Sequence, residues 1–446
     1  MRMPIPPSEL MMTCFLPFAH LFRGADFERF VDHCTCLMTQ HHPACLTDVQ
    51  RHALEPLHYS RHRDFVAHGA FEPATLLQTA ARAVGLPQMT TRLSHGREVL
   101  VCVLDDTLRR RPFGRKLFGV AYHHDHAARP DQNDKVQGQC LTLLGVIPHP
   151  LAHQGAQAWL CDAQLWVPFK RAKESEHDTL PYESKLSLAA MMLDSQRAWL
   201  DPETERILLV DALYPKASFF AALSRQPKTY LIGRLANNRA VFLPPGERIS
   251  GQKGRPRIYG ARVDWKAQFE AHRRSHELRL YGREVEVELW GMTGRVRGYA
   301  HDVRLVVSKL PKSKPHLFLC TDLSLSDAEI IRLYAARFSI EEAIKDEVLE
   351  LALGCERGRS EEVYSSQMAL KLCAGLLLRQ IAQHQPKEVA EALRDPWRKA
   401  SPRLTMGQVR KVLYWECLSA QSVLSRDGLG RGACQNSRPE KHPQVA

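Results

Sequence analysis

The sequence predicts an α/β fold, with a helical N-terminal segment before a mixed sheet that has helices on both faces. Three observations support this class. Apolar residues recur at helical spacing up to about residue 95, apolar β-branched runs alternate with helical segments after it, and residues 217–325 are β-rich. The chain has 446 residues, 44% of them hydrophobic and 25% charged, which is enough for two or three folded domains.

Residues 1–95 are expected to form the helical N-terminal domain. Phe27–Met38 and Pro73–Val84 have the apolar spacing of amphipathic helices. Glu72–Arg92 matches a helix, a turn at Gly85 and a second helix, which is a weak helix-turn-helix pattern. Simple packing of two helices is the more frequent meaning of such a pattern.

The 12 cysteines lack regular spacing, which predicts reduced, mostly buried thiols and a reducing compartment. One cluster combines possible zinc ligands, namely His33, Cys34, Cys36, His41, His42 and Cys45. Its spacing matches no standard zinc module, so ordinary packing is favoured over a zinc site. No apolar run approaches the roughly 18 residues of a membrane span, and no signal peptide is apparent, so we expect a soluble cytoplasmic protein.

The first part of the sheet core is expected over residues 96–216. Val99–Leu104 is a continuous apolar run typical of a strand buried on both faces. Gln139–Ile147 and Gln157–Val167 predict two more strands. A helix over Lys185–Trp199 and a strand over Arg206–Val210 complete this part.

Residues 217–325 are expected to form an inserted β-rich domain. Short apolar runs such as TYLIGRL, EVEVELWG and VRLVVSKL are separated by Gly, Pro and Arg-bearing turns. Between Arg225 and Pro315 there are 20 Lys and Arg but only 8 Asp and Glu, a surplus equal to the whole net charge of +12. This concentration favours a nucleic-acid-binding surface, and the alternative is a solvated charged β-domain.

Residues 326–424 are expected to be helical. A long helix is predicted over Ser326–Leu353, because Ser326 and Glu329 have capping-box spacing and Gly354 is a natural stop. Further helices should extend to about Leu424. The polar tail at residues 425–446 is expected to be disordered.

Acidic residues lie where this fold gathers ligands. Asp105 and Asp106 end one apolar strand, Asp211 ends another, and Glu341 lies in the long helix. Carboxylates at the carboxyl ends of strands can converge with one on a facing helix around two Mg²⁺ or Mn²⁺ ions, which suits in-line attack on a phosphodiester. Each acid alone is more often a cap or turn residue. No phosphate-binding G-x-x-x-x-G-K-[ST] loop is present, which argues against ATP-driven chemistry.

Three motifs resemble a known family. The strand and DDT of Val101–Thr107 resemble a first-aspartate motif in which the acid before Thr is catalytic, which selects Asp106 over Asp105. The segment ILLVDALYPKASFF is similar to a second motif and gives Asp211. Tyr334, Arg337 and Glu341 have Y-x2-R-x3-E spacing, which on one helix places them on one face. These motifs resemble bacterial insertion-sequence DDE transposases, whose RNase H-like, retroviral-integrase-like core is interrupted by a β-strand domain.

The resemblance implies a cut-and-paste DNA transposase. Asp106, Asp211 and Glu341 would hold two Mg²⁺ or Mn²⁺ ions, and Tyr334 and Arg337 would bind phosphates near the cut. The family usually has a Lys seven residues after the Glu; this chain has Val348, and Lys345 is a possible substitute.

The implied partners are DNA and a second copy of the chain. The DNA comprises the terminal inverted repeats of a mobile element and the target, and pairing two ends implies a homodimer in the DNA complex. The N-terminal domain would serve end binding or assembly. Two alternatives stay open, a transposase relic that binds DNA without cutting, motivated by Val348, and a metal-dependent nuclease without strand transfer. A tyrosine recombinase is less consistent with this α/β sequence.

Further DNA contacts are expected outside the acid motifs. Lys253–Arg257 reads KGRPR and resembles a minor-groove hook through Arg255 and Arg257, although a tight surface turn fits equally well. Trp265 and Trp290 are candidates for stacking on a displaced base, against ordinary packing. The remaining expected contacts are Arg357 and Arg359 for the flanking strand. The HHDH run at His123–His126 is interpreted as a polar loop.

Overall fold

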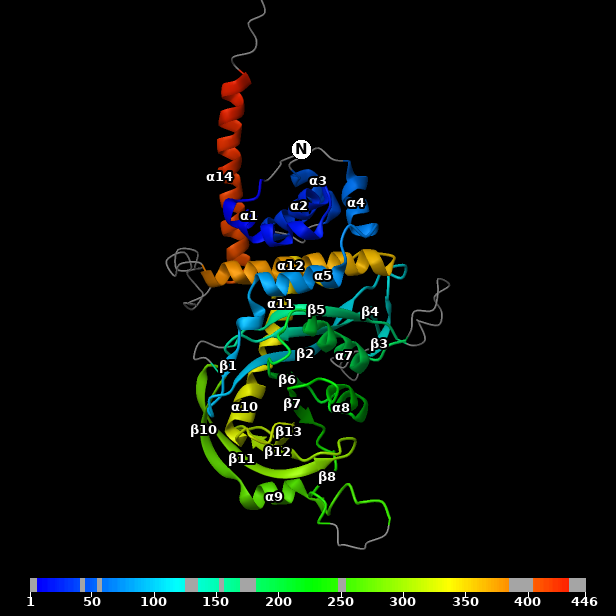
Figure 1. Ribbon diagram of the computed structural model, residues 1–446, viewed down its shortest axis with the longest axis vertical. Coiled ribbons are helices and arrows are strands. Elements are labelled where there is room, and N and C mark those ends of the chain that lie inside the picture. The colour runs from blue at the N-terminus through cyan, green and yellow to red at the C-terminus, as the bar shows by residue number, and fades with distance from the viewer. Residues whose placement is uncertain are drawn as a thin grey trace, which may run out of the picture. The chain divides into compact units, whose positions relative to one another are not determined.

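A computed structural model describes residues 6–40, 45–53, 58–124, 135–151, 156–168, 182–247, 254–384 and 404–432, without the side chains of 420–432 (Figure 1). The chain divides into two compact units. One comprises Met1–Phe71 with Leu377–Ala446, and the other Glu72–Leu376. The last helices therefore group with the N-terminal ones, which the expected domain boundaries at residues 95 and 326 did not anticipate.

The first unit is helical and has an aromatic core. Its helices are α1 (Glu9–Phe15), α2 (Asp26–Thr39), α3 (Leu46–His52), α4 (Tyr59–Ala67) and α14 (Met406–Gly432), with a 3₁₀ turn at Leu16–Leu21. Phe22 stacks on Phe30 with ring centroids 4.8 Å apart, and Phe15 and Phe18 pack on the same ring. Helix α14 continues to Gly432, so its last turns occupy the start of the segment that was expected to be disordered; residues 433–446 lie outside the described part.

The cysteine and histidine cluster of this unit is mostly packed inside it. Cys34 and Cys36 are buried in α2, and the exposed Cys45 thiol donates to Asp48, 3.0 Å away. His33 is buried with its ring 5.6 Å from that of His62. Among the described residues no group of three His, Cys, Asp or Glu side chains is arranged to hold a metal ion, and His41 and His42 lie outside that part.

The second unit is built on a mixed sheet. Its core strands are β2 (Glu98–Arg110), β3 (Ala121–His124), β4 (Lys135–Val146), β5 (Trp159–Trp166), β6 (Arg206–Val210) and β7 (Thr229–Leu235). Strand β4 is antiparallel to β2 and β5, whereas β6 is parallel to both β2 and β7. The order β5-β4-β2-β6-β7, with these directions, is that of an RNase H-like core, as the sequence predicted. Every residue of β6 is buried, which explains why all of them except Arg206 are apolar.

The β-rich segment extends this same sheet. It contains β8 (Val241–Phe242), β9 (Arg262–Val263), α9 (Trp265–His272), β10 (Arg274–Leu280), β11 (Arg283–Val296), β12 (Val303–Lys309) and β13 (His316–Cys320). Strand β13 returns antiparallel to β7, and β12 and β11 follow it outward. Figure 1 shows β10 and β11 as a long curved hairpin at the edge of this extension. The insertion is thus joined to the core sheet through the pairing of β13 with β7, and its other strands pair with one another.

The second helix suggested by the weak helix-turn-helix pattern at Glu72–Arg92 does not form. Helix α5 (Pro73–Ala83) forms, and Gly85 takes a left-handed φ of 75°. The chain then makes a short 3₁₀ turn at Leu86–Gln88 and enters strand β1 (Thr91–Arg92), which pairs with β2. Pro87 removes a helical donor and the paired Thr90 and Thr91 favour extended backbone, so the second helix does not form.

The remaining helices of this unit are α7 (Lys185–Ser195), α8 (Ala217–Leu223), α10 (Asp327–Ala336), α11 (Ser339–Leu351) and α12 (Glu361–His384), the last of which continues into the other unit. None of the helices in the described part is long and apolar enough to cross a membrane. The helix expected over Ser326–Leu353 is divided in two at Arg337 and Phe338. Both residues keep right-handed helical φ and ψ, but their backbone N–H groups bond three residues back, which tightens the turn.

The capping box at the start of α10 is confirmed. The Ser326 hydroxyl accepts from the Glu329 N–H, and the Glu329 carboxylate accepts from the Ser326 N–H. Asp327 accepts a bidentate pair of hydrogen bonds from Arg304 of β12, at 2.7 and 2.8 Å. The start of α10 is therefore fixed to the inserted strands, which sets the position of the residues that follow it.

Candidate active site

Strand β2 does not end at its two aspartates but continues to Arg110, and it pairs with β4 from Cys102 to Arg110. Since successive side chains of a strand point to opposite faces, Asp105 and Asp106 cannot serve the same site. The sequence prediction placed both acids at a strand end, where this constraint is absent. Which of the two aspartates belongs to the site therefore depends on which face of the sheet carries the other site residues.

Asp105 lies on the face that carries Asp211. Val103 pairs with Leu209 in the parallel β2–β6 register, so two residues further on Asp105 comes level with Asp211, just after β6. Burial raises the pKa of Asp105 to about 6; the Arg337 guanidinium opposes the rise, and the charges of Asp211 and Asp106 add to it. Two neighbouring carboxyl groups, one of them buried, are typical of a site that binds a cation.

Arg337 joins Asp105 to Glu341. Its guanidinium donates to Asp105 Oδ2 at 2.6 Å through one terminal nitrogen and to Glu341 Oε1 at 2.9 Å through the other. The Arg337 side chain is 17% exposed and that of Asp105 18%, whereas Glu341 is 47% exposed. Although a helix break separates Arg337 from Glu341, the helical backbone across the break keeps them within reach of each other.

Tyr334 belongs to the same group. Its ring packs edge-on against Phe318 of β13, with centroids 4.7 Å apart, and Arg337 lies 5.9 Å from the ring centroid. Burial raises the pKa of Tyr334 to about 12; Arg337 opposes the rise and Asp211 adds to it. The structure thus brings together Tyr334, Arg337, Glu341 and Asp211, as predicted from the sequence, but with Asp105.

Asp106 faces the other side of β2 and has three partners there. Its carboxylate accepts from Thr142 Oγ1 at 2.8 Å, from Tyr214 OH at 3.2 Å and from Lys185 Nζ at 3.2 Å. Tyr214 is fully buried and follows Asp211 by three residues. Asp106 therefore anchors the loop that carries Asp211, a supporting contact that the spacing of the acids in the sequence did not reveal.

The tip of the β10–β11 hairpin reaches this site. Leu280 pairs with Arg283, so Tyr281 and Gly282 form a two-residue turn in which both have positive φ, 54° and 78°. Arg337 and Glu341 both influence the pKa of Tyr281, which burial raises. A bulky residue in left-handed backbone is uncommon and points to a functional constraint at this turn.

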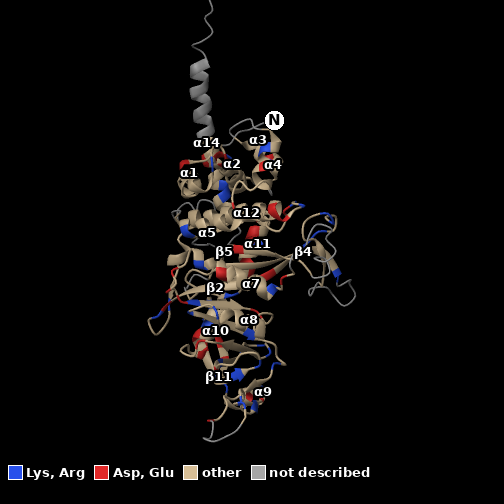
Figure 2. Cartoon of the chain, turned by 45° about the vertical axis from the view of Figure 1, so that its right-hand side comes forward, with Lys and Arg blue, Asp and Glu red and all other residues tan. Residues whose placement is uncertain are grey.

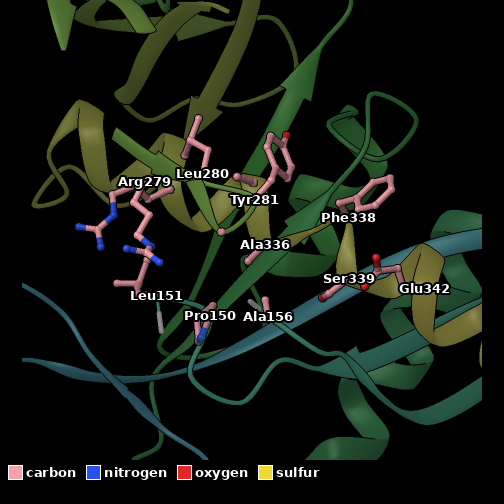
Figure 3. Close-up of a pocket in the computed structure, with 13 residues that line it drawn as sticks. Pro150, Leu151, Ala156, Arg279, Leu280, Tyr281, Ala336, Phe338, Ser339 and Glu342 are labelled. Carbon is pink, nitrogen blue, oxygen red and sulfur yellow. The ribbon is translucent and has the colours of Figure 1, made fainter. Parts of the chain in front are cut away.

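Tyr281 lines a cavity of about 540 Å³ whose other wall is formed by α10 and the start of α11. Its ring meets that of Phe338 edge-on with centroids 6.3 Å apart, and both side chains are about half exposed. Figure 3 shows these two rings near each other and Arg279 farther along the wall, with Pro150 and Leu151 opposite. The cavity thus combines aromatic rings with charged side chains, the cations Arg279 and Arg332 and the acid Glu342. Its aromatic residues were missed because nothing in the sequence distinguishes Tyr281 from an ordinary hairpin residue.

The other predicted DNA contacts are spread over the second unit. Lys345 is exposed on α11, and Arg357 and Arg359 are exposed in the segment after it. Arg255 and Arg257 are exposed, while Lys253 lies outside the described residues. Charged positions of the inserted strands and α9 are marked in Figure 2.

The two tryptophans are not free aromatic surfaces. Trp265 is buried at the start of α9, and Trp290 is half-buried within β11, opposite Val307. Packing therefore accounts for Trp265, and the exposed rings next to the carboxylates belong to Tyr281 and Phe338 instead.

The histidine run after the first motif begins in a strand. His123 is buried in β3, bonds to the Gly138 carbonyl through Nε2 at 3.1 Å and lies against Trp166. His124 ends the same strand, so these two residues are not part of a loop as expected; Asp125 and His126 lie outside the described part.

The donor set suits a divalent cation, although the acids are not gathered around one position. Carboxylate oxygens are the ligands that Mg²⁺ and Mn²⁺ prefer. Within the described ranges no three acidic, His or Cys side chains form a ready metal cluster, since Arg337 lies between Asp105 and Glu341. The Arg337 guanidinium places a positive charge between these two carboxylates, where a metal ion would otherwise place one.

An RNase H-ordered sheet with one acid on β2, a second directly after the parallel strand β6 and a third on a neighbouring helix is the arrangement of a nuclease-type core. Comparison with known families agrees: the family described as DDE superfamily endonuclease matches residues 18–284. The match covers more than half of the chain, which therefore belongs to the DDE superfamily endonucleases, a family that acts on DNA and generally uses divalent metal ions. A search of curated proteins gave no match.

Proposed function

We propose that this endonuclease is a DNA transposase whose catalytic acids are Asp105, Asp211 and Glu341. The observation that carries the assignment is the single guanidinium of Arg337 bonded to both Asp105 and Glu341, with Asp211 level with Asp105 on the neighbouring strand. The sequence motif favoured Asp106, but that carboxylate is engaged with Thr142, Tyr214 and Lys185 on the opposite face. Asp106 is accordingly proposed as a positioning residue for the Asp211 loop.

The three acids would hold the divalent ions. Bound Mg²⁺ or Mn²⁺ would supply Lewis acidity and an activated hydroxyl for attack on a phosphodiester. The chain contributes a partly buried carboxyl pair on a rigid sheet, which fixes the direction of the ligands, and a third, more exposed carboxylate at the start of α11. Arg337 would exchange a carboxylate for a DNA phosphate, which matches its planar donor geometry equally well.

The cavity lined by Tyr281 and Phe338 would receive an unpaired base. Aromatic stacking contributes about 1–3 kcal/mol per base, and Tyr281 and Phe338 expose their rings there. This replaces Trp290 as the stacking candidate. Lys345, Arg357 and Arg359, together with Arg255 and Arg257 of the basic insertion, would bind phosphates along the DNA.

The proposed reaction is cut-and-paste transposition. The chain would bind the terminal inverted repeats of a mobile element, hydrolyse the phosphodiesters that free the 3′ ends, and join those ends to target DNA. Two ends must be cut together, so a homodimer in the DNA complex is part of the proposal.

The test compares neighbouring acids in the full chain. Asp105→Asn, Asp211→Asn and Glu341→Gln should each lower Mg²⁺- or Mn²⁺-dependent cleavage of a plasmid carrying the element ends by about 10²–10³-fold or more. Asp106→Asn keeps an oxygen acceptor for Tyr214 and should retain much of the activity. The opposite ranking of Asp105→Asn and Asp106→Asn, with circular dichroism showing both folded, would return the assignment to Asp106.

The products separate transposition from simpler functions. Recombinant molecules joining element 3′ ends to target DNA are expected. Cleavage without joined products would indicate a nuclease, and binding without cleavage by the wild-type chain would indicate a relic.

A further inference from the structure

The loop between β2 and β3 carries the most exposed large apolar side chain in the described part of the chain. Phe113 is 99% exposed, and the neighbouring Pro112 is exposed too. Removing a Phe side chain from water is worth about 1.5–3 kcal/mol, so leaving it outside any core is unfavourable unless a partner covers it. A single exposed aromatic side chain is ordinary on a protein surface, so the geometry and charge of the loop decide whether Phe113 marks a binding site.

The loop is fixed at both ends. Gln137 of β4 accepts from the Arg111 N–H and donates to its carbonyl, both at 2.8 Å, and Gln139 donates to the Phe118 carbonyl at 2.7 Å. Between these points, the Leu117 N–H closes a turn onto the Gly114 carbonyl at 3.0 Å. Phe113 is therefore presented at the tip of a tethered loop, which lowers the entropy cost of binding through it.

The segment that follows α11 packs against this loop. Arg111 donates to the Gly354 carbonyl at 2.6 Å, and the Phe118 N–H donates to the Gly358 carbonyl at 3.0 Å. The two segments enclose an open hollow of about 590 Å³. Among the described residues that line it, Arg115, Lys116 and Arg359 are charged and none is acidic. The surface around Phe113 is thus cationic, a composition that suits phosphates.

The lengths of β2 and α11 give the approximate distance from the proposed catalytic acids to the near side of the hollow. Strand β2 and helix α11 are joined at one end by the Arg337–Asp105 bond and at the other by the Arg111–Gly354 bond. Five strand residues from Asp105 to Arg110 span about 17 Å, and ten helical residues from Glu341 to Leu351 span about 15 Å. At about 3.4 Å per base pair, this separation corresponds to roughly five base pairs of duplex.

We propose that the segment Arg111–Leu117, together with Arg359, is a docking surface for double-helical DNA about five base pairs from the scissile phosphate. Arg115, Lys116 and Arg359 bind phosphates, and Phe113 inserts at a base step and partly unstacks it. Apolar wedges flanked by cations are a known way to kink or unwind a duplex. The inference rests on the proposed function for the position of the DNA but assigns a site outside the catalytic acids.

The test uses the full chain with Asp105→Asn in every sample, so that cutting does not disturb the DNA and binding is measured whether or not the chain proves to be a transposase. The first probe is a fluorescein-labelled 30-bp duplex of mixed sequence, titrated between 50 and 200 mM KCl. Arg115→Ala/Lys116→Ala should make the slope of log K against log salt shallower by about two, one for each lost phosphate contact.

A charge-matched control is available in the same unit. Arg225→Ala/Lys228→Ala also removes two exposed cations, but from the turn before β7. Since β6 and β7 are parallel, this turn lies at the N-terminal ends of the strands, whereas Asp211 lies at their C-terminal ends. The slope of log K against log salt should therefore stay within error of the parent.

The second probe measures unwinding. A nicked plasmid is sealed by ligase with the protein bound, and the linking number of the product is read on a gel. The parent and Phe113→Trp should lower the linking number, whereas Phe113→Ala should leave it near the value of protein-free DNA. Because Phe113 is exposed, these substitutions do not disturb a core.

Three results would overturn the proposal. An unchanged salt slope in Arg115→Ala/Lys116→Ala, or an equal change in the control pair, would remove the phosphate contacts. An undiminished shift with Phe113→Ala would remove the wedge. Polyglutamate competing as well as DNA for the parent, but not for Arg115→Ala/Lys116→Ala, would assign the surface to an acidic protein. Loss of cleavage alone in the catalytic assay would overturn the proposed function and leave this surface standing.

Discussion

Replacing Arg337 with Gln should strengthen the binding of Mn²⁺ to the DNA-free protein while weakening DNA cleavage. Arg337 holds Asp105 and Glu341, so a cation that uses both carboxylates must displace it from at least one. A charge-assisted hydrogen bond to a partly buried carboxylate contributes about 1.5–3 kcal/mol, whereas the contact with the more exposed Glu341 contributes about 1 kcal/mol or less. Relief of the Asp105 contact therefore corresponds to roughly 10–100-fold tighter Mn²⁺ binding.

The pH of this measurement matters. Arg337 lowers the pKa of Asp105, which burial raises to about 6, so its removal lets that pKa rise further and allows protons to compete with the metal. The titration is therefore done at pH 8.5, with free Mn²⁺ followed by electron paramagnetic resonance. Arg332→Gln, which removes one positive charge from the neighbouring turn of α10, is the matched control. Equal or weaker Mn²⁺ binding by Arg337→Gln than by the control would refute the view that the guanidinium occupies the place of a cation.

Three further predictions follow from single contacts. Tyr281→Ala should weaken binding of a single-stranded oligonucleotide by about 5–100-fold, the loss of one stacked base, as measured by fluorescence anisotropy; unchanged affinity would exclude a base in the cavity. The pKa of His33 is lowered to about 3 by burial and a neighbouring histidine, below its unfolded value of about 6.5. Because the folded protein holds His33 neutral, its contribution to the free energy of unfolding is full above pH 6.5 and is lost as the pH falls. The loss amounts to about 2 kcal/mol between pH 8 and pH 5. Urea unfolding at the two pH values should show this loss, and His33→Phe should remove it. Finally, Gly354→Ala should lower the free energy of unfolding by about 2–3 kcal/mol, because φ is +73° and the new Cβ would lie 2.4 Å from Arg109 Cγ. Gly282→Ala, at φ +78° with open space around it, should lower it by about 1 kcal/mol. Thermal unfolding that ranks the two variants equally would contradict the clash.

The sequence predicted those elements whose residues share one environment. Every residue of β6 is buried, so its apolar run, Ile207–Val210, covers all of the strand except Arg206, and Asp211 follows directly after it. The capping box at Ser326 is likewise a local device, formed within four residues, and it is present in the structure. The family resemblance gave the order of the core strands, which no local pattern contains.

Features that depend on distant partners were not predictable in this way. The break at Arg337 and Phe338 involves neither Pro nor Gly, and nothing in the local sequence marks it. Tyr281 is close to Arg337 and Glu341 only because β11 pairs with β12 and so brings a hairpin of the insertion back to the core. The second helix expected after Gly85 failed because pairing of Thr91 with Val99 competes with weak helical propensity.

The choice between the adjacent aspartates shows how much a strand's length can decide. The apolar run stops at Leu104, and a strand ending there would have left both carboxylates free to turn toward one site. Hydrogen bonding to β4 instead continues to Arg110, although the residues after Leu104 are largely polar, because β4 is long enough to pair with them. Once both acids are within a strand, alternation assigns one to the Asp211 face and the other to Lys185 and Tyr214. The two carboxylates then have separate roles in the proposed mechanism: Asp105 would serve the reaction, and Asp106 would hold the loop that places Asp211 beside it.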